Sequence, residues 1–407
     1  MNVQNSLETI PYGRQWIEED DIQAVVEVLR SDWLTQGPKV KEFEEYFAGY
    51  VGARYAVAVC NGTAALHCAY LAAGIGPGDE VITTPITFAA TANAAFYCGA
   101  RPYFVDIDPN TYNLDPEKLK RYLRGKRGDT PKAVVPVHMA GLPCEMEKIQ
   151  AIAQEYNLLV IEDACHALGA QYQARTGSVN SQNGRGNAGD WSRVGSCRHS
   201  DMSVFSFHPV KHITCGEGGM ITTNSKELYD RLLLYRNHGI THEVQHPLFH
   251  DLDSRFYCEM KVLGFNFRMN DIQGALGLSQ LKKVDQWVKR RRDIASQYLK
   301  AFADLGEVRL PYTNGCTLSA YHLFLLQVKH RSCWLSELQS RGIRCQVHYL
   351  PLPLHPFYRQ KGYDMDQLPE AGSYYEKCLS IPIFPKMTDE QTRRVMEAIK
   401  TIGGSGR

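Results

Sequence analysis

Short apolar runs alternate with segments of helical character over much of the chain. Runs that are rich in β-branched and aromatic residues and bounded by turn residues are typical of buried strands. Seven of them lie at residues 55–60, 80–85, 102–107, 132–138, 158–163, 202–207 and 219–223. Because strands that alternate with helices form parallel sheets covered on both faces, we expect an α/β domain over residues 1–270 with a mostly parallel, seven-stranded sheet.

Helix start signals occur between these runs. Thr63, Thr87 and Asp115 each precede a helical pattern, so that a side-chain oxygen could accept a hydrogen bond from the first turn. We therefore expect helices that begin at these three residues and cover the sheet.

The periodicity changes after the last strand. Residues 271–306 have an almost uninterrupted helical pattern, which predicts one long helix that links the sheet domain to a second domain. Strand and helix patterns are mixed in residues 307–407, which predicts a smaller α+β domain. Its strand candidates are residues 322–328 and 343–349, and its helix candidates are residues 331–341 and 388–401.

Residues 174–200 break the alternation within the large domain. They are rich in Gly, Ser, Asn and Arg and lie between two apolar runs. This composition is typical of exposed loops. We expect a surface insertion here, and a role in gating substrate entry is the alternative.

The size and charge of the chain restrict its function. With 407 residues, it can form a large and a small domain with a sizeable core, which suits a metabolic enzyme. Its 45 Lys and Arg residues nearly balance 44 Asp and Glu residues, for a net charge of +1. No overall field would attract nucleic acid or an anionic membrane, so neither is expected as a partner.

The cysteines and the N-terminus indicate the compartment. Twelve cysteines are scattered without the close CxxC pairs of zinc or redox sites, so we expect reduced thiols and no metal site. The first residues lack the basic start and apolar run of a signal peptide, and no stretch approaches the ~18 apolar residues of a membrane span. A soluble, cytoplasmic protein is expected.

Candidate reactive residues lie where two apolar runs end. Asp163 closes one run, and Ser206 and Lys211 lie at and after the end of another. Ligands of parallel α/β sheets bind beyond the carboxyl ends of strands, so these side chains are placed to meet one. Enzymes that use pyridoxal phosphate (PLP) pair a lysine, which forms a Schiff base with the cofactor, with an Asp on its pyridine nitrogen. Taken singly, both residues would more simply be structural or solvated.

Two further segments join a strand to a helix. Gly62 and Thr63 could offer free N–H groups and a hydroxyl to a phosphate at a helix N-terminus. Phe88 could place an aromatic face over a planar ring. An ordinary turn and core packing are the alternatives for these residues.

Five blocks, in this order and spacing, resemble the DegT/StrS family of nucleotide-sugar aminotransferases. They are GTAAL at 62–66, ITTPITFAATANA at 82–94, VIEDACHALGA at 160–170, FSFHPVKHITCGEGG at 205–219 and GFNFRMNDIQGALGLSQL at 264–281. The resemblance covers nearly the whole chain, from about Tyr12 to about Ile402. It implies an aspartate-aminotransferase-like fold (PLP fold type I), PLP as the cofactor and transaminase activity.

The resemblance also implies catalytic roles. Lys211 would bind PLP covalently and, once freed, carry a proton between the amino donor and the cofactor. Asp163 would pair with the protonated pyridine nitrogen. His166 would lie near the phenolic oxygen of PLP, and Phe88 would stack on its ring.

Binding residues follow from the same resemblance. Gly62, Thr63 and Ser206 would bind the phosphate of PLP, and Asn266 from the other subunit would complete this site. A homodimer with shared active sites is therefore implied. Sugar-nucleotide contacts are implied at Tyr12, Asp32, Trp33, Leu34, Thr35, Gly62, Ser206, Asn266, Gln346, Val347, His348 and Tyr349.

Within the family, four segments resemble the members that serve pseudaminic acid biosynthesis. They are SDWLTQGP at 31–38, ITTPITF at 82–88, FSFHPVKHIT at 205–214 and QVHYLPL at 346–352. These members imply L-glutamate as amino donor and a UDP-linked 4-keto-6-deoxy-N-acetylhexosamine as acceptor. Another UDP- or dTDP-linked keto sugar is the alternative.

Three other functions stay open at this point. Some family members dehydrate sugars, but in those the lysine is replaced, whereas Lys211 is present here. A lyase of the same fold, such as a cysteine desulfurase, would need a reactive loop cysteine, for which Cys197 or Cys215 could be considered. A non-catalytic sensor could keep the fold, although the intact Lys211 and Asp163 and the absence of a basic DNA-binding segment argue against it.

Overall fold

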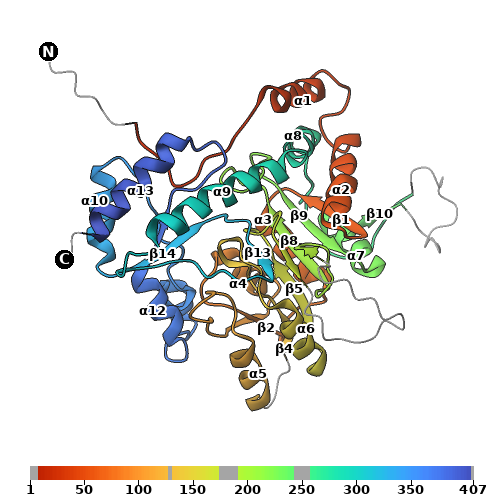
Figure 1. Cartoon of the computed structure of the whole chain (residues 1–407). Helices are drawn as coiled ribbons and strands as arrows, with labels where there is room; N and C mark the ends of the chain where they lie inside the picture. The colour runs from red at the N-terminus through yellow and green to blue at the C-terminus, as the bar shows by residue number, and fades with distance from the viewer. Residues whose placement is uncertain (1–7, 127–130, 174–190, 243–256, 405–407) are drawn as a thin grey trace, which may run out of the picture.

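A computed structural model describes residues 8–126, 131–173, 191–242 and 257–404. At its centre lies a seven-stranded sheet in the order β1-β9-β8-β5-β4-β2-β3 (Figure 1), which confirms the predicted sheet. Each strand overlaps one of the seven apolar runs. The strands are β1 (Tyr55–Val59), β2 (Glu80–Thr83), β3 (Arg101–Phe104), β4 (Pro131–Val134), β5 (Leu159–Asp163), β8 (Met202–Ser206) and β9 (Gly219–Thr223).

Strand direction decides where a ligand can bind. β9 is antiparallel to its neighbours β1 and β8, while the remaining pairs of the sheet are parallel. β1 therefore runs in the same direction as β8. The carboxyl ends of β1, β2, β5 and β8 meet at one edge, where ligands of such sheets bind.

Helices bury apolar side chains against both faces of this sheet. In β1, Val57 and Val59 pack with α3, α4 and α7, whereas Ala56 and Ala58 pack with α2, α8 and α9. Burial on both faces explains why most positions of these runs are apolar. The helices are α2 (Pro38–Val51), α3 (Gly62–Ala72), α4 (Ala89–Tyr97), α5 (Pro116–Gly125), α6 (Met146–Glu155), α7 (Lys226–Arg236), α8 (Asp271–Leu281) and α9 (Val284–Phe302).

One of the three predicted helix starts is right. Asp115 caps α5, because its Oδ1 accepts from the N–H of Glu117 at 2.8 Å. The cap of α3 is Asn61, whose Oδ1 accepts from the N–H of Ala64 at 2.8 Å, so Thr63 already lies in the first turn. α4 begins after Phe88 without a side-chain cap. An N-cap needs an extended backbone as well as a suitable side chain, and only the structure shows which residue has both.

The single long helix predicted over residues 271–306 is wrong. α8 ends at Leu281 and α9 begins at Val284. Lys283, at the break, forms ion pairs with Asp20 and Asp21 at 2.7 and 2.9 Å, which ties the turn to α1 (Glu19–Leu29). α8 packs on α1 and α2, while α9 extends to α13 (Asp389–Gly403). The bend depends on this distant contact, so a continuous helical period could not indicate it.

The C-terminal part contains a small antiparallel sheet of β12 (Val308–Arg309), β14 (Phe324–Val328) and β15 (Cys378–Ile381). β14, α10 (Arg331–Ser340) and α13 agree with the predicted elements. The strand predicted at 343–349 is wrong, because this segment makes only isolated bridges, Ile343 to Ile10 and Gln346 to Ser380. Gln346 pairs with Ser380 on the edge of β15 that faces away from β14, but no neighbouring pair extends this single bridge into a strand.

The predicted insertion at 174–200 is partly corrected. Residues 174–190 lie outside the described residues. Residues 191–193 form β7, which pairs with β6 (Gln171–Gln173), and Val194 and Cys197 beyond it are buried rather than exposed. Gly195, with a φ of +97°, turns the chain so closely over Phe205 that a Cβ would lie 2.6 Å from Cζ of that ring.

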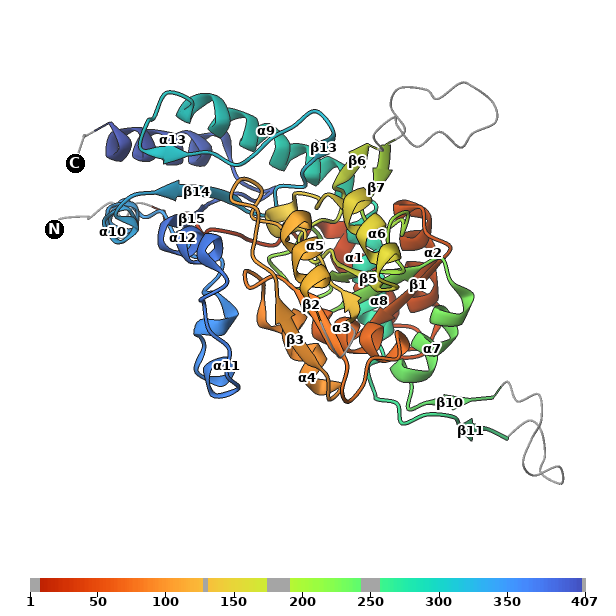
Figure 2. The same ribbon diagram turned by 90° about the horizontal axis from the view of Figure 1, so that it is seen from below.

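The remaining elements are short. β10 and β11 reach away from the sheet (Figure 2). Within residues 8–126, 131–173, 191–242 and 257–404, no helix is both long and apolar enough to cross a membrane. These elements are η1 (Met139–Gly141), β10 (Ile240–Thr241), β11 (Glu259–Met260), β13 (Thr317–Leu318), η2 (Leu352–Leu354), α11 (Pro356–Gln360) and α12 (Pro369–Lys377).

Candidate active site

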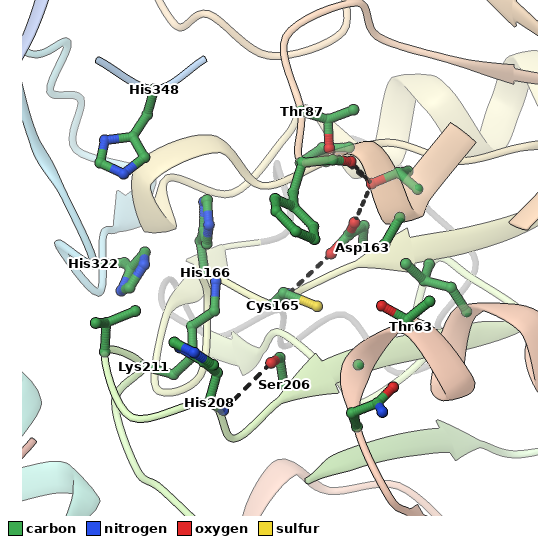
Figure 3. Close-up of a pocket in the computed structure, with 18 of the residues that line it drawn as sticks. Thr63, Thr87, Asp163, Cys165, His166, Ser206, His208, Lys211, His322 and His348 are labelled. Carbon is green, nitrogen blue, oxygen red and sulfur yellow. Dashed lines mark hydrogen bonds between the residues drawn. The ribbon is translucent and has the colours of Figure 1, made fainter. Parts of the chain in front are cut away.

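A cavity of about 470 Å³ lies at the carboxyl edge of the sheet. Its walls come from the turn after β1, the start of α4, the end of β5, the loop between β8 and β9, and the segment at 348–349 (Figure 3). Residues far apart in sequence meet here because their strands end at the same edge. The predicted site residues that line it are Tyr12, Gly62, Thr63, Phe88, Asp163, His166, Ser206, Lys211, His348 and Tyr349.

A chain of hydroxyl groups holds Asp163. Thr91 Oγ1 donates to Asp163 Oδ2 at 2.7 Å, and Thr87 Oγ1 lies 2.7 Å from Thr91 Oγ1. Since each hydroxyl has one proton, Thr87 donates to Thr91 when Thr91 donates to the carboxylate. The N–H of Cys165 donates to the other oxygen, Oδ1, at 3.2 Å. The motifs in the sequence did not indicate Thr91, although a threonine among the alanines of α4 was a visible signal.

Lys211 lies in the loop between β8 and β9. Its backbone N–H donates to the backbone carbonyl of His208 at 2.8 Å, which turns the loop toward the cavity. Desolvation lowers the pKa of the Lys211 amine, while Cys165 and Asp163 act in the opposite direction. A lowered pKa increases the fraction of neutral amine, which is the nucleophilic form.

Neutral histidines form one wall of the cavity. His166 Nε2 lies 3.2 Å from Tyr349 Oη, and the His166 ring centroid is 4.4 Å from that of His322. Desolvation lowers the pKa of both histidines well below the ordinary value. His348 Nδ1 lies 2.7 Å from Ser380 Oγ, and burial lowers the pKa of His348 to about 4. The motifs in the sequence did not indicate His322, whose only signal was its position as a polar residue at the start of an apolar run.

The opposite end of the cavity is suited to an anion. A Cβ at Gly62 would lie 2.9 Å from Ser206 Cβ, so the start of α3 packs directly on the end of β8. The first N–H groups of a helix have no acceptor within it and attract negative charge. The Asn61 side chain accepts a hydrogen bond from the N–H of Ala64, while Gly62 and Thr63, with the Thr63 hydroxyl, border the cavity.

Several predicted contacts do not line the cavity of their own chain. Gln346 borders a neighbouring cavity of about 350 Å³, which Tyr12 separates from the main one, while Val347 packs in an apolar cluster. The segment 32–35 is held at the start of α8, where the N–H of Asp271 donates to the carbonyl of Leu34 at 3.0 Å. The remaining predicted contacts are exposed, namely Asp32, Trp33, Leu34, Thr35 and Asn266.

The sequence profile of the DegT/DnrJ/EryC1/StrS aminotransferase family matches residues 15–400. The chain belongs to this family. It is therefore a PLP-dependent sugar aminotransferase, and the aspartate-aminotransferase-like fold is confirmed.

Individual relatives resemble the chain over nearly their whole length. Spore coat polysaccharide biosynthesis protein SpsC of Bacillus subtilis is 40% identical over 408 residues, which cover 98% of both chains. The structure of Helicobacter pylori PseC, an aminotransferase involved in the biosynthesis of pseudoaminic acid, is 30% identical with a TM-score of 0.83 and covers 98% of this chain and 100% of its own. The PLP form of the Streptococcus pneumoniae sugar aminotransferase Spr1654 is 28% identical with a TM-score of 0.84 and covers 97% and 99%.

The cavity fits the cofactor of this family. Its volume of about 470 Å³ is within the range of ligand sites, about 300–1,000 Å³. Lys211, Asp163 and the start of α3 offer an amine, a carboxylate and an anion site, which match the aldehyde, the pyridine nitrogen and the phosphate of PLP. His166 Nδ1 is buried without a partner among the described residues, which leaves it for an oxygen of a bound group.

Proposed function

We propose that this aminotransferase moves the amino group of L-glutamate to C4 of a UDP-4-keto-6-deoxy-N-acetylhexosamine. The product is UDP-4-amino-4,6-dideoxy-N-acetyl-beta-L-altrosamine, which serves pseudaminic acid biosynthesis. The likeness to PseC supports this substrate. The observation that carries the chemistry is the cavity in which Lys211, Asp163 and the start of α3 come together.

The catalytic residues have separate tasks in this proposal. PLP, when bound, accepts and returns the amino group and withdraws electrons from the reacting carbon. Lys211 holds the cofactor through its amine and, when free, moves the proton between the α carbon of the donor and the cofactor. Asp163, oriented by Thr91, keeps a proton on the pyridine nitrogen. Phe88, which is 61% exposed and borders the cavity, covers one face of the ring.

Binding of the phosphate involves two subunits in this proposal. Gly62, Thr63 and Ser206 hold it from one chain, and Asn266 of the partner subunit completes the site. Asn266 is exposed and lies outside the cavity of its own chain, which supports a role in a neighbouring site. A homodimer with shared active sites is the arrangement we propose.

The sugar nucleotide approaches from the side of the C-terminal part. Tyr12 and His348 border the main cavity, and Tyr12 and Gln346 border the neighbouring one, so the two cavities share a wall. The exposed side chains of Trp33 and Leu34 extend this surface with apolar area that a nucleotide or a partner subunit can cover.

A different keto sugar is the second candidate. SpsC, which is 40% identical, is named for spore coat polysaccharide biosynthesis. This relative favours a UDP- or dTDP-linked keto sugar that is destined for a polysaccharide. The reacting groups of the cavity would serve either sugar equally.

A substrate panel separates these candidates. The purified protein is incubated with PLP, L-glutamate and a set of UDP- and dTDP-linked 4-keto-6-deoxy sugars, and products are identified by mass. We expect amination of the UDP-linked N-acetylhexosamine with the highest kcat/KM. Preference for another sugar would support the second candidate, and no amination of any sugar would contradict both.

A further inference from the structure

Tyr349, in the C-terminal part of the chain, contacts the wall of the cavity that contains His166. Its hydroxyl lies 3.2 Å from His166 Nε2, and its ring is 6.3 Å from that of Phe88 in an edge-to-face arrangement. His166 belongs to the turn after β5, 183 positions away in sequence. The contact therefore joins two parts of the chain at the candidate active site.

The donors and acceptors around Tyr349 and His166 indicate which of the two side chains donates in this contact. Among the described residues, the Tyr349 hydroxyl has no second partner and His166 Nδ1 has none. If His166 Nε2 donated, the Tyr349 proton would have no partner among the described residues, and the Nδ1 lone pair would be buried without one. If Tyr349 donates, only the Nδ1 proton is left, and a bound acceptor can take it. The second arrangement leaves fewer polar groups unsatisfied.

We propose that Tyr349 is a positioning residue for His166: its hydroxyl donates to Nε2 and keeps the imidazole proton on Nδ1, which offers it to the phenolic oxygen of PLP. This inference rests on the proposed PLP-dependent function and on the position near the phenolic oxygen of PLP that the family resemblance implies for His166. Tyr349 thus acts on the cofactor through His166, in addition to any contact with the sugar.

The surroundings keep His166 neutral and in place. The His322 ring lies 4.4 Å from the His166 ring and limits its rotation. Burial lowers the pKa of His166 well below its ordinary value, with further contributions from Lys211, His348 and His212. A neutral imidazole has one proton to place, so the group that donates to one nitrogen selects the tautomer.

The test combines a spectroscopic and a binding measurement on the full chain. Side-chain ¹⁵N signals of His166 are recorded in ¹⁵N-histidine-labelled apoprotein, assigned with His166→Gln, in wild type and in Tyr349→Phe. PLP affinity is measured by fluorescence titration. The matched control is Tyr358→Phe, which loses a buried hydroxyl that donates to Asn93 Oδ1 at 2.7 Å, away from the cavity.

We expect a protonated Nδ1 and an accepting Nε2 in the wild type. In Tyr349→Phe, the Nε2–H form should appear and PLP should bind about five- to tenfold more weakly, as expected for the loss of one hydrogen bond. Tyr358→Phe should lower the Tm without either effect. A protonated Nε2 in the wild type, or unchanged signals and PLP affinity in Tyr349→Phe, would overturn the inference. Neither measurement involves a sugar, so failure of the substrate proposal would be seen separately.

Discussion

Replacing Thr91 by Val removes the hydroxyl that donates to Asp163 and keeps the shape of the side chain. The lost contact is a buried hydrogen bond of 2.7 Å to a carboxylate. Hydrogen bonds to charged groups are worth about 1.5–3 kcal/mol, which corresponds to roughly 10- to 150-fold in a rate or an affinity. The N–H of Cys165 still holds the other oxygen at 3.2 Å. We therefore expect kcat/KM to decrease by a factor near the lower end of that range, roughly tenfold.

The matched control for this prediction is Thr83→Val. Thr83 is fully buried in β2, and its hydroxyl donates to the carbonyl of Val135 at 2.8 Å without bordering the cavity. In urea unfolding, Thr83→Val should lose about 0.5–1.5 kcal/mol of stability and Thr91→Val about 1.5–3 kcal/mol. Only Thr91→Val should slow the half-reaction with glutamate, measured by stopped-flow absorbance. A normal rate in Thr91→Val, or an equal loss in Thr83→Val, would refute the role assigned to Thr91.

Three further predictions concern the proposed roles. Lys211→Ala should lose turnover yet bind PLP non-covalently, and borohydride reduction should attach PLP to wild-type Lys211 but not to the variant; multiple turnover by the variant would contradict the assignment. Mixing Lys211→Ala with Asn266→Ala chains should restore part of the activity, because one site of each hybrid dimer contains neither change; no recovery after verified subunit exchange would place Asn266 in its own site. His348→Ala should spare the glutamate half-reaction and lower kcat/KM for the keto sugar by ~1–3 kcal/mol; equal loss in both half-reactions would indicate a packing role.

The strands, and Asp163 and Lys211 at the candidate active site, were predictable because their signals in the sequence are local. β5 and β8 are buried on both faces, so most of their residues are apolar, and β5 ends at Asp163. Lys211 follows β8 in a loop that returns through glycines to β9. The family blocks then gave these residues their roles, since the blocks keep the same order and spacing.

The helix boundaries and the conformation of residues 343–349 were not predictable in this way. Asn61 rather than Thr63 caps α3, and the break at Lys283 depends on its pairing with the carboxylates of α1. Nothing local to residues 343–349 shows that the segment meets β15 only through the single bridge of Gln346 to Ser380.

The sequence by itself therefore determined the sheet, the edge at which ligands bind, and the lysine and carboxylate expected there. The tertiary structure decided which groups orient them. Thr91 meets Asp163 across 72 positions of sequence, and Tyr349 meets His166 across 183. These partners come together because the order and direction of strands bring distant segments to one edge, and no local pattern records which side chain will face which.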